Sequence, residues 1–130
     1  MPDEKKKILL VEDEEYLSEM YEEYLCEEGY SITIAKNGDQ GITEIKNGEF
    51  DLILLDIMMP MTDGLQVLQA LTDTDKSRNG PIVMLSQLSN EPIIKQAIGY
   101  GAVGYIIKSD TNLPDLSKKV KAFLIKGNRL

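Results

Sequence analysis

Five side chains able to do chemistry stand directly after short apolar runs in this chain of 130 residues. They are three carboxylates, one hydroxyl and one amine: Glu12, Asp13, Asp56, Ser86 and Lys108. Burying a charged group costs free energy unless the charge is paired. Three carboxylates about 5 Å apart would also repel one another by roughly 3 kcal/mol per pair at an effective dielectric of ~20. If the fold brings these residues together, Lys108 alone leaves the group negative, and we expect a divalent cation to complete it.

The residue types indicate which cation and which ligand this group would take. Oxygen ligands without histidine or cysteine nearby favour Mg²⁺ over zinc or copper. The chain has no histidine, and its one cysteine, Cys26, is expected to be a small core residue. Mg²⁺ held by few carboxylates keeps bound waters and often takes a further oxygen from a phosphate. The sequence therefore predicts a phosphoryl site, with Asp56, on the central strand, as the carboxylate that would form an acyl phosphate.

Short apolar runs and amphipathic segments alternate along the chain and predict the elements that position these side chains. The expected strands are residues 8–11, 31–35, 52–55, 82–85 and 105–107. Such continuous runs, without alternation, suit strands buried on both faces of a sheet. Helical periodicity follows each expected strand, near residues 17–25, 40–46, 65–71, 91–99 and 113–123, and residues 73–80 are expected to be turns. The predicted fold is α/β, a parallel sheet with five helices on its two faces.

This arrangement would gather the five polar side chains at one edge. In an open parallel sheet, ligands bind beyond the carboxyl ends of the strands, where the strand order reverses. Each residue also has an ordinary structural explanation. The acids could cap a helix, Ser86 could end a strand, and Lys108 could pair with any carboxylate. The coincidence of all five at strand ends favours a site.

Length and charge exclude several classes of protein. The length fits one domain, 1–130, with a core of about residues 6–126. The net charge of −8 argues against direct nucleic-acid binding. No apolar run is long enough to span a bilayer, and the charged start of the chain lacks a targeting core, so we expect a cytoplasmic protein without membrane contact. Seven acidic residues in 14–28 and the lysines of the last segment are solvated faces or docking surfaces of opposite sign.

At this spacing the residues resemble the receiver domain of bacterial two-component response regulators, and in particular single-domain, chemotaxis-regulator-like receivers. The resemblance covers essentially the whole chain. It rests on the acidic pair after ILLV, the pattern D-x-x-M-P-x-x-D-G from Asp56 to Gly64, Ser86 thirty residues after Asp56, Lys108 twenty-two residues later, and the stretch GAVGYIIK, which contains Tyr105. It implies a flavodoxin-like, doubly wound sheet of five parallel strands in the order 2-1-3-4-5.

The resemblance also implies roles for individual residues. Asp56 would be the phosphoacceptor, taking its phosphoryl group from a phosphohistidine of a sensor histidine kinase or a histidine phosphotransfer protein in a phosphorelay. Mg²⁺ would be held by Asp13, Asp56 and the backbone carbonyl of Met58, and by Glu12 through a water. Lys108 would pair with the phosphoryl oxygens, while Ser86 and Tyr105 would be the switch residues that reorient. The output would be a changed affinity for a protein target, or a homodimer formed through the Tyr105 face.

Two positions depart from the family pattern. Ser109 stands where the family usually has a proline after a cis bond, so we expect a trans bond and a rerouted loop. Met58 offers no polar group to position an attacking water, which predicts slow autodephosphorylation.

Three alternatives stay open beside this signalling switch, which we expect not to be an enzyme. The chain could be a pseudo-receiver that binds a partner without phosphorylation, or a receiver module excised from a longer regulator or hybrid kinase. It could also be a Mg²⁺-dependent phosphatase, although the second acid that such an enzyme needs is replaced by Met58.

Overall fold

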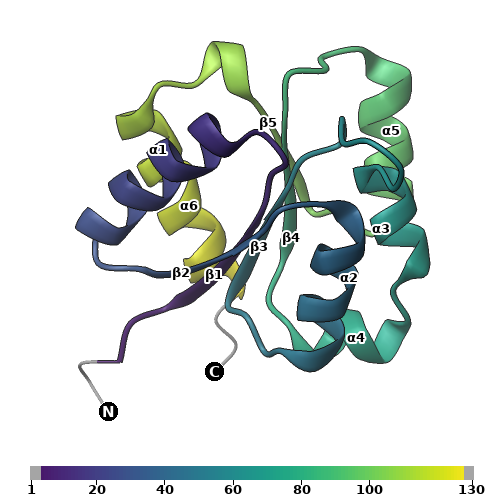
Figure 1. Ribbon diagram of the computed structural model, residues 1–130, viewed down its shortest axis with the longest axis horizontal. Coiled ribbons are helices and arrows are strands. Elements are labelled where there is room, and N and C mark those ends of the chain that lie inside the picture. The colour runs from purple at the N-terminus through teal and green to yellow at the C-terminus, as the bar shows by residue number, and fades with distance from the viewer. Residues whose placement is uncertain (1–3, 128–130) are drawn as a thin grey trace.

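A five-stranded parallel sheet with helices on both faces makes up the computed structural model, which describes residues 4–127 (Figure 1). The strands are β1 (Lys7–Val11), β2 (Ser31–Ala35), β3 (Leu52–Leu55), β4 (Ile82–Ser86) and β5 (Gly104–Ile107). The helices are α1 (Glu15–Glu27), α2 (Gly38–Asn47), α3 (Gly64–Ala70), α4 (Asp73–Arg78), α5 (Glu91–Gly99) and α6 (Leu113–Gly127), with one 3-10 turn, η1 (Lys108–Asp110). The strand order β2-β1-β3-β4-β5 confirms the predicted doubly wound α/β fold.

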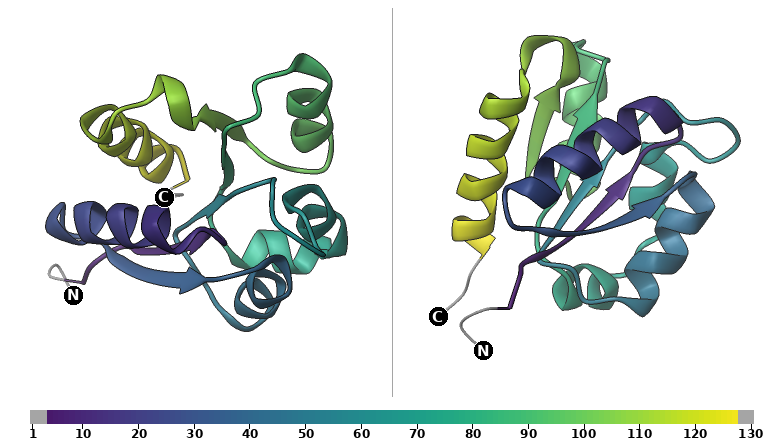
Figure 2. Two further views of the ribbon diagram at one scale, coloured as in Figure 1. Left: turned by 45° about the horizontal axis from the view of Figure 1, so that its top comes forward. Right: turned by 60° about the vertical axis from the view of Figure 1, so that its left-hand side comes forward.

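The sheet separates two apolar layers, because successive side chains of a strand point to opposite faces. From β1, Leu9 and Val11 pack in the layer under α2, α3 and α5. Ile8 and Leu10 pack in the other layer, under α1 and α6. The views in Figure 2 show α1 and α6 together on one side of the sheet and α2 to α5 on the other. All four residues of β3 are buried, as the unbroken run LILL predicts for a central strand.

The predicted ends of α1 and α5, each followed by a glycine, are confirmed. Gly29 after α1 and Gly101 after α5 have φ angles of 101° and 113°, a region in which only glycine is unstrained. Beyond these turns the chain enters β2 and β5 directly. Residues 4–127 contain no helix that is both long and apolar enough to cross a membrane.

Two details of the sequence-based prediction are wrong. Residues 73–80 were expected to be turns, but Asp73–Arg78 form α4, so the described chain has six α-helices where five were predicted. Thr72 and Asp75 make a capping box that begins this short helix without any apolar periodicity. Cys26 is exposed and lies outside the core, because its neighbour Leu25 takes the buried position on α1.

Candidate functional site

The register of the sheet brings the polar strand ends together. Val11 pairs with Leu55, so the residues that follow them, Glu12 and Asp56, emerge side by side at the carboxyl edge. Ser86 pairs with Ile107, which places Lys108 just beyond β5 at the same edge. All five predicted side chains thus belong to one edge of the sheet, at the point where the order of the strands reverses.

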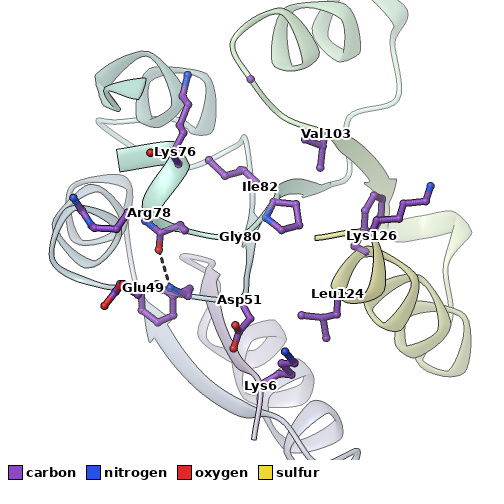
Figure 3. A pocket seen from close by; sticks show the side chains of 16 residues that line it. Lys6, Glu49, Asp51, Lys76, Arg78, Gly80, Ile82, Val103, Leu124 and Lys126 are labelled. Carbon is purple, nitrogen blue, oxygen red and sulfur yellow. Dashed lines mark hydrogen bonds between the residues drawn. The ribbon is translucent and has the colours of Figure 1, made fainter. Parts of the chain in front are cut away.

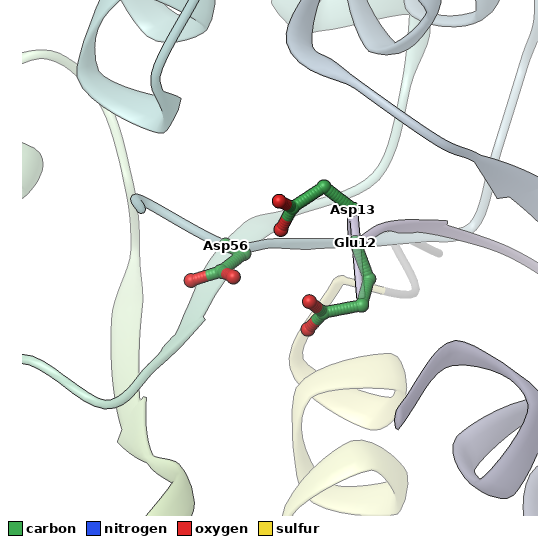
Figure 4. Close-up of side chains that lie close together, drawn as sticks. All are labelled: Glu12, Asp13 and Asp56. Carbon is green, nitrogen blue, oxygen red and sulfur yellow. The ribbon is translucent and has the colours of Figure 1, made fainter. Parts of the chain in front are cut away.

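Three carboxylates face one another at this edge (Figure 4). Glu12, Asp13 and Asp56 each offer an oxygen, and these oxygens all lie within 4.8 Å of one another. Glu12 and Asp56 are buried, whereas Asp13 is exposed to solvent. An oxygen-only donor set with one open side fits Mg²⁺, which prefers carboxylates and retains water ligands.

Lys108 ties two of these carboxylates together. Its ammonium donates to Glu12 Oε1 at 2.5 Å and to Asp56 Oδ2 at 3.2 Å. The three side chains are almost fully buried, with 5%, 2% and 7% of their surfaces exposed for Lys108, Glu12 and Asp56 respectively. The lysine supplies one positive charge to three carboxylates, so the described site remains negative and can accept a further cation.

Burial and charge act in opposite directions on the titration of this group. Burial raises the pKa of Glu12 above its ordinary value, and the hydrogen bond from Lys108 offsets only part of that effect. Burial by itself would lower the pKa of Lys108, but the hydrogen bond to Glu12 and the charge of Asp56 raise it above its ordinary value. The ammonium is therefore charged at neutral pH and is available to an anion beside Asp56.

The loop from 56 to 64 is held by several hydrogen bonds. The backbone N–H of Met58 donates to Asp56 Oδ1 at 3.4 Å, and the backbone N–H of Gly64 donates to the carbonyl of Ile57 at 2.9 Å. Thr62 Oγ1 donates to Asp39 Oδ1 at 2.9 Å, which joins the loop to α2. Within this loop Met61 has a φ angle of 70°, a left-handed conformation that strains a residue other than glycine.

The two predicted switch residues meet at a backbone position that sequence reasoning did not identify. The backbone N–H of Leu88 donates to Ser86 Oγ at 3.1 Å. The Tyr105 hydroxyl donates to the carbonyl of the same residue, Leu88, at 2.6 Å. Contacts to a peptide group leave no mark on side-chain identity, so the sequence carried no signal for this role. The peptide bonds of the described residues are all trans, as expected at Ser109.

Two hollows of similar volume lie at opposite edges of the sheet on the described surface, and one of them adjoins these residues. A groove of about 620 Å³ runs beside Lys108, between Leu17, Met20 and Tyr21 of α1 and the segment 109–114. A hollow of about 640 Å³ lies at the opposite edge of the sheet (Figure 3).

Three polar side chains of the opposite hollow already make hydrogen bonds. Arg78 donates to the carbonyl of Lys46, Lys76 donates to the carbonyl of Tyr100, and Asn79 accepts from the backbone of Phe50. Its lining carries no group of side chains comparable to the carboxylates around Lys108. The candidate site is therefore the carboxyl edge of the sheet.

Comparison with known proteins identifies the family of the chain. The model of the response regulator receiver domain matches residues 8–121. The chain belongs to this family. The receiver is a signalling module of two-component systems, and the acidic edge of the sheet lies within the matched segment.

The chain is similar to part of some longer proteins and to nearly the whole of some solved receiver domains. An uncharacterized transcriptional regulatory protein of Bacillus subtilis, YcbL, is 36% identical over 114 residues, which are 88% of this chain and 49% of that protein. A CheY-like receiver domain from Methanospirillum hungatei superposes with a TM-score of 0.87 at 27% identity, covering 95% of this chain and 97% of the other. The chain spans about half the length of the curated relatives that it matches first.

One similar solved structure is of a response regulator in complex with a metal ion. The response regulator TrrA of Thermotoga maritima, described in complex with Mg²⁺ and BeF, superposes with a TM-score of 0.78 at 35% identity, covering 91% of this chain and 98% of the other.

Proposed function

We propose that this receiver is a phosphorylation-dependent signalling switch whose phosphoacceptor is Asp56. The observation that carries the proposal is the Lys108 ammonium between Glu12 and Asp56, with an oxygen of Asp13 within 4.8 Å of an oxygen of each carboxylate. A buried lysine beside an acid at an open sheet edge can receive a phosphoryl oxygen without any rearrangement of the strands.

The phosphoryl transfer uses residues at the carboxyl edge. A carboxylate oxygen of Asp56 attacks phosphorus, and the bond from phosphorus to the imidazole nitrogen of a donor phosphohistidine breaks. The product is an aspartyl phosphate. Lys108 pairs with a phosphoryl oxygen, and the Ser86 hydroxyl turns from the N–H of Leu88 to donate to another oxygen. Tyr105 then moves into the space that Ser86 leaves, and the surface around β5 and α5 changes.

A metal ion belongs to this proposal. Asp13, Asp56 and the backbone carbonyl of Met58 would hold Mg²⁺ directly, and Glu12 would hold it through a water. Bound Mg²⁺ supplies charge neutralisation between the carboxylates and the incoming phosphoryl oxygens. The complex of TrrA with Mg²⁺ and BeF supports this assignment by analogy.

The partners follow from the surfaces around the site. The phosphodonor is a sensor histidine kinase or a histidine phosphotransfer protein, which approaches the groove beside Lys108 and the acidic helix α1. The downstream partner is a protein, or a second copy of this chain, that contacts the Tyr105 face. We propose that the chain acts in the cytoplasm, without direct nucleic-acid contact of its own, and as a switch with no substrate turnover beyond its own phosphate.

Intact mass measurement tests the proposal. The chain is incubated with acetyl phosphate, with and without Mg²⁺, beside Asp56→Asn and the matched control Asp51→Asn, which changes a carboxylate at the opposite edge of the sheet. We expect one phosphoryl adduct that requires Mg²⁺ and Asp56 and that survives the Asp51 change. An adduct that persists in Asp56→Asn would refute the assignment of the phosphoacceptor.

A further inference from the structure

Three methionines follow the proposed phosphoacceptor in the loop from 56 to 64, and they differ sharply in exposure. Met58 and Met61 expose 58% and 95% of their surfaces, whereas Met59 between them exposes 7%. Peroxides oxidise exposed thioethers to sulfoxides far faster than buried ones. The loop therefore offers two reactive sulfur atoms within a few residues of Asp56, with a protected neighbour in the same segment.

Of the two exposed residues, Met58 is the one tied to Asp56. Its backbone N–H donates to Asp56 Oδ1, and the hydrogen bond from Gly64 to Ile57 fixes the backbone on either side. The Met58 side chain thus emerges into solvent from a fixed point beside the carboxylate. Met61 lies beyond Pro60, and no hydrogen bond among the described residues joins it to the carboxylates.

The chemical character of the Met58 side chain affects the water that reaches a phosphoryl group on Asp56. A thioether is a weak hydrogen-bond acceptor and does not orient water. A sulfoxide oxygen is polar and a strong acceptor, and it could hold a water by its hydrogen at this position. Hydrolysis of an acyl phosphate requires such a water to be oriented toward phosphorus.

We infer that Met58 is a peroxide-sensitive modification site whose oxidation shortens the lifetime of the aspartyl phosphate. In the modification step the sulfur lone pair attacks one oxygen of hydrogen peroxide and the O–O bond breaks. The proton on the transferred oxygen passes to the departing oxygen, which leaves as water, and methionine becomes methionine sulfoxide. The protein is oxidised and the peroxide is reduced. The consequence for the phosphate rests on the proposed function of Asp56, whereas the reactivity of the sulfur does not.

The test uses the whole chain and two reagents. Protein is treated with hydrogen peroxide and desalted, and peptide mass mapping locates the added oxygen. The treated and untreated samples are then phosphorylated with acetyl phosphate and Mg²⁺, and the decay of the adduct is followed by intact mass. We expect oxygen on Met58 and Met61 but not on Met59, and a half-life about fivefold shorter, the factor given by one net hydrogen bond in the transition state.

Three variants separate Met58 from its neighbours. Met61→Leu should respond to peroxide as the parent does, and Met58→Leu should show the same half-life before and after treatment. Met58→Gln, which carries an acceptor oxygen without oxidation, should reproduce the short half-life in untreated protein.

The outcomes distinguish this inference from the proposed function. Absence of an adduct in untreated protein would refute the proposed function. A phosphoryl adduct that forms in untreated protein and has the same half-life after peroxide treatment would refute the inference on Met58 but not the proposed function. Loss of the adduct after oxidation, without faster release of inorganic phosphate from acetyl phosphate, would also refute it, because oxidation would then block phosphorylation.

Discussion

At the scale of single residues, Met61 has a strained backbone that no side-chain burial compensates. Its φ angle of 70° lies in the left-handed region, and its side chain is almost entirely exposed. A residue with a Cβ pays about 1 kcal/mol or more for this conformation. Strain of this kind is common in loops that carry reactive groups, because the surrounding structure imposes it.

Glycine at position 61 should relieve this strain. The free energy of unfolding of Met61→Gly is expected to be about 1 kcal/mol higher than that of Met61→Ala, so the glycine variant should be the more stable one. Alanine keeps the Cβ that causes the strain, and glycine does not. Urea unfolding of the two variants measures the difference. The parent should resemble Met61→Ala within about 0.5 kcal/mol, as expected for an exposed side chain. A glycine variant no more stable than the alanine variant would show that this loop relaxes in solution.

At the scale of elements, the loop between β4 and α5 is held by Tyr105 from the neighbouring strand. Tyr105→Phe removes the hydroxyl that donates to the Leu88 carbonyl and should lower the free energy of unfolding by about 1 kcal/mol. Amide protons of residues 88–90 should exchange faster in this variant. The matched control is Tyr100→Phe, whose hydroxyl makes no hydrogen bond among the described residues, and it should change neither quantity.

The short helix α4 is held through the buried carboxylate of Asp75. Lys46 Nζ donates to Asp75 Oδ2 at 2.7 Å, and the backbone N–H of Thr72 donates to the same oxygen at 2.9 Å. The hydrogen bond from Lys46 and that from the Thr72 backbone hold the pKa of Asp75 well below its ordinary value of 3.8. This helix therefore depends on an ionised side chain more than on apolar contacts.

A depressed pKa has a definite sign in the pH dependence of stability. The contribution of Asp75 is fully present above pH 3.8, its ordinary pKa, and is lost as the pH falls below that value toward the lower pKa of the folded state. Asp75→Asn should thus be less stable than the parent at neutral pH, and the difference should narrow below about pH 4. Urea unfolding of both proteins across this range measures it. A difference that is constant with pH would mean that the charge of Asp75 does not support α4.

At the scale of the whole molecule, the crowded carboxylates link metal binding to global stability. Mg²⁺ at ten times its dissociation constant should raise the free energy of unfolding by about 1.4 kcal/mol if only the folded chain binds it. Asp13→Asn should abolish this increment. Without metal the same variant should be more stable than the parent, because one of three mutually repelling carboxylates is gone. The gain should be at most about 1 kcal/mol, because Asp13 is exposed and solvent screens its charge. Urea unfolding with and without Mg²⁺ gives all four values, and an undiminished Mg²⁺ increment in Asp13→Asn would contradict the ligand assignment.

The path of the chain was predictable because buried parallel strands have a strong sequence signal. Continuous apolar runs such as residues 52–55 and 82–85 do not fit an exposed strand or an amphipathic helix, so they indicate buried strands. Because parallel strands end at the same edge of a sheet, the polar residues that follow these runs could be predicted to lie together. Helix α4 escaped prediction because it buries no apolar stripe. Its local signals were a capping box at Thr72 and Asp75, acidic residues in the first turn and basic residues in the last turn.

The details of the site that sequence did not predict depend on the exact path of the backbone. The pairing of Lys108 with both Glu12 and Asp56 depends on the stagger of three strands, and the sharing of Leu88 depends on the path of a loop. The left-handed conformation of Met61 likewise arises from closure of the loop, and methionine has no preference that would indicate it.

The shared use of Leu88 makes this one residue a spectroscopic reporter of the site. Its amide nitrogen senses the hydrogen bond to Ser86, and its carbonyl carbon senses the hydrogen bond from Tyr105. Isotope labels on these two nuclei therefore follow the two side chains separately within a single peptide segment. If both side chains rearrange in one concerted event, the two nuclei will report the same exchange rate and the same populations. If each moves on its own, the nitrogen and carbon signals will yield two different rates.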